Sequence, residues 1–312
     1  MILSVIIPVY NSEKIINNLV IDISNQIKKN NRIKNFEVIL VNDSSKDKSW
    51  DEIVNICKIN NFVVGVNLMK NSGQHNALMA GIKLCKGDFI ITMDDDYQHS
   101  PNYISSLLDE IGKGFDVCYT NYVNKKYGII KKFFSFMNHK ILNILLKKPK
   151  HIYLSSYKCF SKKIAMELIK YDGPFVYIDG LILNITNKLG IIDIEHSERE
   201  HGKSNYNYKK LISLWLKVVT NFSVIPLRLV TIFGFLMTLV SVILIISIIL
   251  IKLSNPEIPA GWPSLAILVI FFAGIQLIAL GIIGEYIGKS YLNLNKKPQY
   301  IVRETLNYKK NE

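Results

Sequence analysis

Three consecutive carboxylates follow a short apolar run in the N-terminal half of the chain. Residues Phe89–Met93 have the pattern of a buried strand, and Asp94, Asp95 and Asp96 come directly after it. Because side chains of an extended chain alternate between two faces, Asp94 and Asp96 are expected on one face and Asp95 on the other. Together with the amide oxygen of Gln98, Asp94 and Asp96 form an oxygen-only ligand set that suits Mg²⁺ or Mn²⁺. An isolated Asp-x-Asp is more often a solvated acidic turn, so the neighbouring segments must decide between the two interpretations.

Apolar, β-branched runs alternate with amphipathic stretches as far as about residue 120. This alternation predicts an α/β domain whose sheet is mostly parallel and covered on both faces by helices. The expected strands are Leu3–Val9, Glu37–Val41, Phe62–Leu68, Phe89–Met93, Asp116–Tyr119 and, further on, Tyr153–Phe160, and the expected helices are Glu13–Lys28, Lys48–Asn60, Gly73–Leu84 and Pro101–Ile111.

Polar segments follow four of the expected strands, at residues 8–13, 41–47, 70–75 and 94–98. In parallel sheets the carboxyl ends of the strands meet at one edge, and ligands bind there. Four polar segments at one edge are hard to explain by packing alone. They therefore favour a binding site over a solvated acidic turn.

These segments resemble the glycosyltransferases of family 2, which have the GT-A fold, and within them the branch that charges polyprenyl phosphates with a sugar. The family patterns I-P-x-Y-N-E, V-D-D-x-S-x-D and M-D-A-D-L-Q-x-P-P correspond here to residues 7–12, 41–47 and 93–101. Ser12 stands where the family often has Glu, and Asn42 replaces the first Asp of its pair. Around residues 73–75 and 284–286 the chain is most similar to the aminoarabinose and formyl-aminoarabinose transferases, with bactoprenol glucosyltransferases and dolichol-phosphate mannosyltransferases further away.

The resemblance implies a set of site residues. A metal, Mg²⁺ or Mn²⁺, would be held by Asp94, Asp96 and Gln98, and the catalytic residues would be Asp96 and Arg199. The residues expected to bind the nucleotide-sugar are Pro8, Tyr10, Asn11, Glu13, Val41, Asp43, Gly73, Asp94 and Asp95, and those expected to bind the acceptor or the pyrophosphate are Lys158, Arg199, Lys203 and Ser204.

Arg199 begins a segment that matches the relatives' R-x-x-G-x-S-x-Y pattern. The chain has only four arginines and uses Lys nearly everywhere else. Retention of Arg at this position suggests a planar, bidentate contact with phosphate that Lys cannot make.

The C-terminal part contains two long apolar stretches, each sufficient to cross a bilayer as a helix. Basic residues are frequent after the second stretch and nearly absent from the link between the two, which predicts that the catalytic domain and the tail are both cytoplasmic. The expected organisation is a GT-A domain (1–205) that includes a basic amphipathic helix suited to a membrane surface (127–147), a juxtamembrane helix (206–228), a first membrane span (229–251), an external link (252–263), a second span (264–284) and a cytoplasmic basic tail (285–312).

The net charge of +13 suggests anionic partners, and the apolar spans exclude an ordinary nucleic-acid-binding protein. The resemblance implies inverting, metal-dependent transfer of a sugar, with a UDP-sugar as the expected donor and undecaprenyl phosphate as the expected acceptor. It places this reaction at the cytoplasmic face of the cell membrane and implies a homo-oligomer, for which a tetramer is considered. A membrane polysaccharide synthase and a non-catalytic membrane scaffold remain as alternatives, and the sugar is undetermined.

Overall fold

The computed structural model describes residues 1–123, 149, 152–174, 176–195, 225–254, 261–295 and 297–308. The chain divides into two compact units, one formed by Met1–Tyr206 with Lys296–Glu312 and the other by Asn207–Asn295. The membrane-surface helix expected at 127–147 and most of the juxtamembrane helix expected at 206–228 lie outside the described residues.

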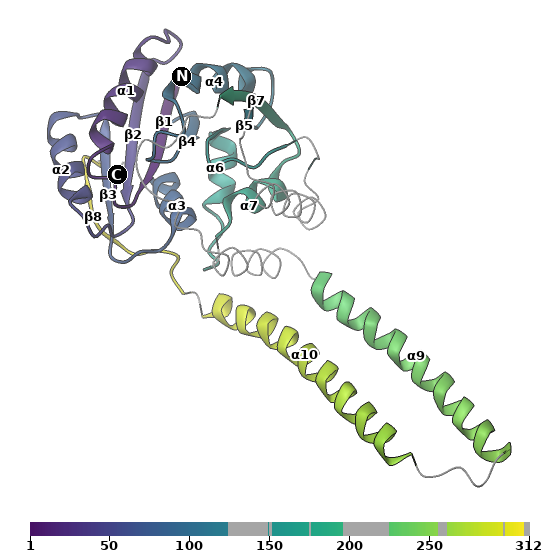
Figure 1. Cartoon of the computed structure of the whole chain (residues 1–312). Coiled ribbons are helices and arrows are strands. Elements are labelled where there is room, and N and C mark those ends of the chain that lie inside the picture. Colours follow the sequence, from purple (N-terminus) through teal and green to yellow (C-terminus); the bar gives the residue numbers. More distant parts are fainter. Residues whose placement is uncertain are drawn as a thin grey trace. The chain divides into compact units, whose positions relative to one another are not determined.

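The first unit is built on an eight-stranded mixed sheet with the strand order β7-β5-β6-β4-β1-β2-β3-β8. Figure 1 labels the strands of this sheet other than β6. Strand pairs β1–β2, β1–β4, β2–β3 and β5–β7 are parallel, and the pairs made by β6 and β8 are antiparallel. The expected α/β fold with a mostly parallel sheet is therefore confirmed. The strands are β1 (Ile2–Val9), β2 (Asn35–Asn42), β3 (Val63–Leu68), β4 (Phe89–Thr92), β5 (Val117–Val123), β6 (Lys158–Ser161), β7 (Leu189–Glu195) and β8 (Val302–Leu306).

Helices cover both faces of this sheet, because the side chains of the central strands are apolar on both sides. Along β1, for example, Leu3, Val5 and Ile7 pack into one core and Ile6 into the other. The first core receives apolar residues of α1, α2 and α4, and the second receives those of α3, α6 and α7. These helices are α1 (Ile16–Lys28), α2 (Ser49–Ile59), α3 (Gln74–Leu84), α4 (Ile104–Gly112, preceded by the 3₁₀ turn η1, Pro101–Tyr103), α6 (Lys162–Leu168) and α7 (Ile178–Ile185).

The structure differs from the sequence-based expectation mainly in the second half of the chain. The strand expected at Tyr153–Phe160 begins only at Lys158, and the sequence pattern does not predict α6, α7 or β7. The range 285–312, expected to form a basic tail, contains regular structure. Helix α10 continues to Leu294, and Val302–Leu306 forms β8. Strand β8 pairs antiparallel with β3 and so forms one edge of the eight-stranded sheet.

The second unit contains two long helices, α9 (Ile225–Ser254) and α10 (Trp262–Leu294), which contact each other. Most of their described apolar side chains are exposed, among them Phe235 at 70% and Leu277 at 69%. Within the described residues, Phe271–Leu294 is long and apolar enough to cross a membrane, with a mean hydropathy of 1.6.

Candidate active site

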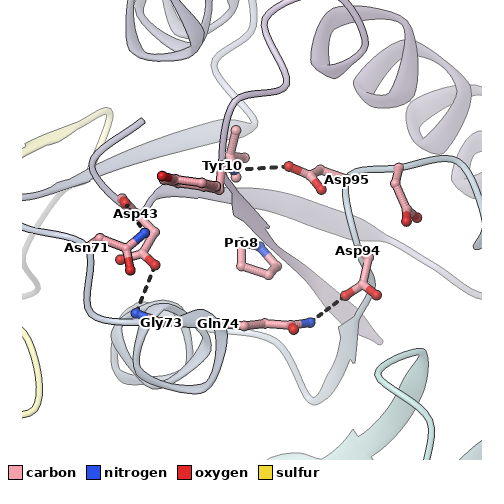
Figure 2. A pocket seen from close by; sticks show the side chains of 10 residues that line it. Pro8, Tyr10, Asp43, Asn71, Gly73, Gln74, Asp94 and Asp95 are labelled. Atoms are coloured by element: carbon pink, nitrogen blue, oxygen red, sulfur yellow. Dashed lines mark hydrogen bonds between the residues drawn. The ribbon is translucent and has the colours of Figure 1, made fainter. Parts of the chain in front are cut away.

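A pocket of about 290 Å³ opens at the carboxyl edge of the central strands (Figure 2). Its volume lies at the lower end of the usual range for small-molecule sites. Segments that follow β1, β2, β3 and β4 contribute to it, as expected for strands that run parallel. The lining residues are Pro8, Val9, Tyr10, Asp43, Asn71, Gly73, Gln74, Asp94, Asp95 and Asp96.

Asp43 follows β2 and is held by main-chain groups. Its carboxylate accepts hydrogen bonds from the backbone N–H groups of Ser72 and Gly73 at 2.6 and 2.9 Å. Its backbone carbonyl accepts a further bond from the Asn71 side chain at 3.2 Å. Gly73 can make this contact because its backbone is left-handed, with φ of 88°, which a residue with a Cβ rarely adopts. The position of Asp43 thus depends on the path of the loop that precedes α3.

Asp95 turns toward the loop after β1. Its Oδ2 accepts the Ser12 hydroxyl at 2.5 Å and the Tyr10 backbone N–H at 3.1 Å, and Figure 2 shows the second of these bonds. Ser12 is the residue that departs from the family's Glu. A carboxylate at position 12 could not donate this hydrogen bond, whereas a hydroxyl can.

Asp94 is held by two side chains that come from different parts of the fold. Gln74 at the start of α3 donates to Oδ1 at 2.6 Å, and Ser156 donates to Oδ2 at 2.8 Å (Figure 2 shows the Gln74 contact). The backbone N–H of Asp94 donates to His99 Nδ1 at 2.8 Å, so in the neutral imidazole the proton resides on Nε2. His99 Nε2 lies 3.8 Å from Asp94 Oδ2, and the buried His99 ring stacks on Tyr157.

Asp96 and Gln98 are separated by a residue in an unusual backbone conformation. Tyr97 has φ of 58°, which is uncommon for a bulky side chain, and its hydroxyl donates to Asp22 at 2.9 Å. Strand β4 ends at Thr92, so the alternation of an extended chain does not continue through the acidic cluster. Strand alternation therefore does not place Gln98 beside Asp94 and Asp96, and its role as a metal ligand stays a prediction. Among the described residues Gln98 is not part of the pocket lining, although its backbone N–H donates to Asp96 Oδ1 at 3.2 Å.

The loops after β1 and β2 are tied together beside the pocket. The Asn11 backbone N–H donates to Ser45 Oγ at 3.1 Å, and Asn11 Oδ1 accepts from the Lys46 backbone N–H at 2.8 Å. Glu13 accepts from the Lys48 backbone N–H at 2.9 Å. Asn11 and Glu13 were expected to bind the nucleotide directly, but they are absent from the described lining and instead join these two loops. Val41, expected in the same set, is buried in the second core, which contains residues of α3, α6 and α7.

Burial changes the proton affinity of two of the pocket carboxylates. It raises the pKa of Asp95 to about 6, and the nearby charges of Asp94 and Asp96 act in the same direction while the bonds from Ser12 and Tyr10 oppose it. Burial also raises the pKa of Asp43, against the effect of its two backbone hydrogen bonds. Carboxylates enclosed in this way favour a cation, because a positive charge relieves the cost of keeping them ionised.

Lys158 pairs in register with Thr92, the last residue of β4, and is not among the described lining residues of the pocket. Its side chain is only 2% exposed, and Nζ forms an ion pair with Asp179, whose Oδ1 also accepts the Tyr119 hydroxyl at 3.1 Å. This arrangement does not support the expectation that Lys158 binds a phosphate. The other residues expected on that side of the site, Arg199, Lys203 and Ser204, lie outside the described residues.

The donor chemistry of the pocket fits a hard divalent cation. Asp94 and Asp96 offer carboxylate oxygens, the ligands that Mg²⁺ and Mn²⁺ prefer. Within the described residues, no group of three or more His, Cys, Asp and Glu side chains is arranged to hold a metal. Proteins commonly bind Mg²⁺ through one or two carboxylates, while water and phosphate oxygens occupy the remaining coordination positions.

Sequence reasoning found seven of the ten lining residues, namely Pro8, Tyr10, Asp43, Gly73, Asp94, Asp95 and Asp96. It assigned no role to Ser12, Gln74 or Ser156, which hold the acidic cluster. The contacts of these three residues span 20 to 83 positions in the chain, so local spacing does not reveal them.

The fold is that of the GT-A glycosyltransferases. Residues 4–169 match the sequence model of Glycosyl transferase family 2, and the chain belongs to this family. It is 31% identical over 310 residues to the undecaprenyl-phosphate 4-deoxy-4-formamido-L-arabinose transferase of Photorhabdus laumondii, in an alignment that covers 97% of this chain and 94% of that protein. The protein of the same name from Pseudomonas fluorescens strain Pf0-1 is 31% identical over 97% of this chain and 89% of its own length.

Solved structures show the same fold. Glucosyl-3-phosphoglycerate synthase of Mycobacterium tuberculosis, in complex with Mn²⁺, UDP-glucose and phosphoglyceric acid, superposes with a TM-score of 0.53 at 16% identity, over 70% of this chain and 77% of that chain. A complex of the same enzyme with Mg²⁺ and UDP gives a TM-score of 0.52 at 15% identity, over 70% of this chain and 76% of the enzyme. These comparisons support the fold, and the family assignment makes the chain a glycosyltransferase.

Proposed function

We propose that this glycosyltransferase moves a sugar from a UDP-sugar to a polyprenyl phosphate, with inversion at the anomeric carbon, in a reaction that needs a divalent cation. The names of the two relatives described above, whose alignments cover 97% of this chain, support undecaprenyl phosphate as the acceptor. The observation that carries the proposal is the pocket itself, which places Asp43 and the Asp94–Asp96 cluster around one cavity. A nucleoside diphosphate needs both a site for its base and ribose and a site for its charge.

In this proposal the two parts of the pocket have different tasks. Asp43 holds the nucleoside end, and the acidic cluster lies at the diphosphate end. The first turn of α3, which includes Gln74, adds the partial positive charge of a helix N-terminus near the diphosphate. A divalent cation on Asp94 and Asp96 would neutralise the charge that develops on the leaving diphosphate.

The acceptor needs little help from a general base. A lipid phosphate is already ionised at neutral pH and can attack the anomeric carbon itself, so the enzyme must mainly bring two anions together. Arg199, Lys203 and Ser204 are proposed to neutralise them. Arg199→Ala should slow transfer about 100- to 1000-fold, by analogy with the loss of a charge-stabilising donor. Arg199→Lys should recover only part of this rate, because an ammonium cannot contact two phosphate oxygens in one plane.

The two long helices of the second unit are proposed to cross the cell membrane. With α9 and α10 as spans, both ends of the chain are cytoplasmic and the link between them is external. A single cysteine placed in 255–261 should react with an impermeant maleimide on intact cells, and one at Asn311 should react only after lysis. A variant without the four native cysteines serves as the background, and labelling in the opposite order would overturn the orientation.

The reaction is tested with the full-length protein purified in detergent. A panel of UDP- and GDP-sugars is incubated with undecaprenyl phosphate and Mn²⁺, and the lipid product is separated and identified by mass. Addition of a single sugar supports the proposal. Growth of a polymer would indicate a polysaccharide synthase, and absence of transfer from every donor would leave the proposal without support.

A further inference from the structure

A chain of hydrogen-bonded amides connects the C-terminal strand to the loop that carries Asp43. Asn42, Asn67 and Glu304 are neighbours in register across β2, β3 and β8. Asn42 Nδ2 donates to Asn67 Oδ1 at 2.9 Å, and Asn67 Nδ2 donates to Glu304 Oε1 at 3.2 Å. At the other end, Asn42 Oδ1 accepts from the Ser45 backbone N–H at 3.2 Å.

The direction of every bond in this chain is determined by its two ends. The Ser45 backbone N–H can only donate, and the ionised Glu304 carboxylate can only accept. Each amide between them must therefore present its oxygen toward Ser45 and its nitrogen toward Glu304. Asn42 and Asn67 are only 3% and 7% exposed, so a reversed amide would leave polar atoms unsatisfied where little water is available.

We propose that Asn42, Asn67 and Glu304 are positioning residues for nucleotide binding. They hold the start of the loop at 43–47, and this loop places Asp43 in the pocket. Strand β8 follows α10 in the sequence, so a segment beyond the long helices takes part in shaping the nucleoside end of the site. The inference rests on the proposed function, because it takes a nucleoside diphosphate as the ligand.

The direction of the chain explains why Asn replaces the family's Asp at position 42. A carboxylate there would place an oxygen against Asn67 Oδ1, so that two acceptors would face each other. If the Asn67 amide turned over to donate to that carboxylate, its own oxygen would then face the Glu304 carboxylate. A Gln at position 304 removes this conflict, because its amide nitrogen can donate to the reversed Asn67.

The test is a double-mutant cycle on the full-length protein in detergent, with Asn42→Asp, Glu304→Gln and the double variant. Melting temperature reports on the amide chain, and the Kd for UDP in the presence of Mn²⁺ reports on its effect at the pocket. Glu304→Gln keeps an acceptor, Oε1, for the Asn67 amide at an exposed position, so it should weaken UDP binding less than Asn42→Asp does. Asn42→Asp should lower the melting temperature and weaken UDP binding about tenfold, and the double variant should recover most of both losses.

Asn67→Asp provides a second cycle if Asn42→Asp does not fold. The carboxylate introduced by Asn67→Asp still accepts from Asn42 but faces the Glu304 carboxylate, so Glu304→Gln should again rescue the variant. The proposal is overturned if both single Asp variants behave like the native protein, or if Glu304→Gln rescues neither of them. If the native protein binds no UDP while the melting temperatures still show rescue, the amide chain stands and the proposed nucleotide specificity fails.

Discussion

Asp43 lines the same pocket as Asp94 and Asp95, but it is held in place by a different kind of group. The Asp43 carboxylate is bound by two backbone N–H groups of the loop before α3. Asp94 is bound by the side chains of Gln74 and Ser156, and Asp95 by the Ser12 side chain together with one backbone N–H. A residue held by the backbone shares the stability of its loop. Where side chains hold a carboxylate, each of these side chains can be removed by a single substitution. We therefore expect substitutions in the two regions to differ in their effects on stability and on ligand affinity.

The largest effect is expected for Asp96→Asn, as a loss of rate without a loss of stability. The neutral amide weakens a hard-cation site, and we expect transfer to fall about 100- to 1000-fold, as for the loss of other charge-stabilising groups. The Asn oxygen can still accept from the Gln98 backbone N–H, so the melting temperature should change little. The measurements are transfer rate, Mn²⁺ affinity and melting temperature. Full activity of this variant in the presence of a chelator would contradict the metal site.

Asp43→Asn should combine a loss of UDP affinity with a loss of stability. An amide has only one oxygen, so the Ser72 or the Gly73 N–H loses its acceptor and meets an NH₂ group instead. An unsatisfied buried donor costs about 1–3 kcal/mol, and about 2–4 °C of melting temperature is lost for each kcal/mol in a domain of this size. The control is Asp172→Asn, which removes the same charge at an exposed position. An unchanged melting temperature for Asp43→Asn would remove the distinction between the two regions.

Gln74→Ala should weaken Mn²⁺ binding about tenfold. Gln74 orients the expected metal ligand Asp94, and loss of such a group typically weakens metal binding about 10- to 100-fold. Ser156→Ala removes the other side chain on Asp94 and should act similarly. Because both act through one carboxylate, the double variant should deviate from the sum of the two single effects. Strictly additive losses, measured by titration with Mn²⁺ and UDP, would show that the two side chains do not share Asp94 as their target.

Ser12→Ala should have the smallest effect. Asp95 would lose the Ser12 hydroxyl but keep the Tyr10 backbone N–H, so we expect a loss of about 1 kcal/mol in stability and a transfer rate within about threefold of the native value. Ser12→Thr keeps the hydroxyl and should restore the melting temperature. A loss of rate as large as that of Asp96→Asn would place Ser12 in the chemistry itself.

The strands and helices of the N-terminal part, as far as the end of α4, follow closely from the sequence pattern. Strands such as β1 and β3 are mostly apolar runs, and the helices that follow them have regular apolar spacing. Later elements were harder to predict. Strand β8 contains Arg303, Glu304 and Thr305, which are exposed at the edge of the sheet, and a short polar edge strand has the same composition as a solvated tail.

The sequence by itself determined the fold class and where the pocket lies. Polar segments directly after parallel strands must meet at one sheet edge, which brings residues 8–13, 41–47, 70–75 and 94–98 together. The resemblance to family 2 then selected Pro8, Tyr10, Asp43 and Gly73 within these segments. Only the tertiary structure showed that Tyr97 adopts a left-handed backbone and that Gln98 is not among the described lining residues of the pocket. Tertiary contacts also decided which groups hold each carboxylate, because partners such as Ser12 and Ser156 approach the cluster through pairing of strands and loops that are distant in the chain. Hydrogen-bond partners depend on this packing. The positions of the N-terminal strands along the chain, and the polar segments that follow them, are given by the local sequence pattern.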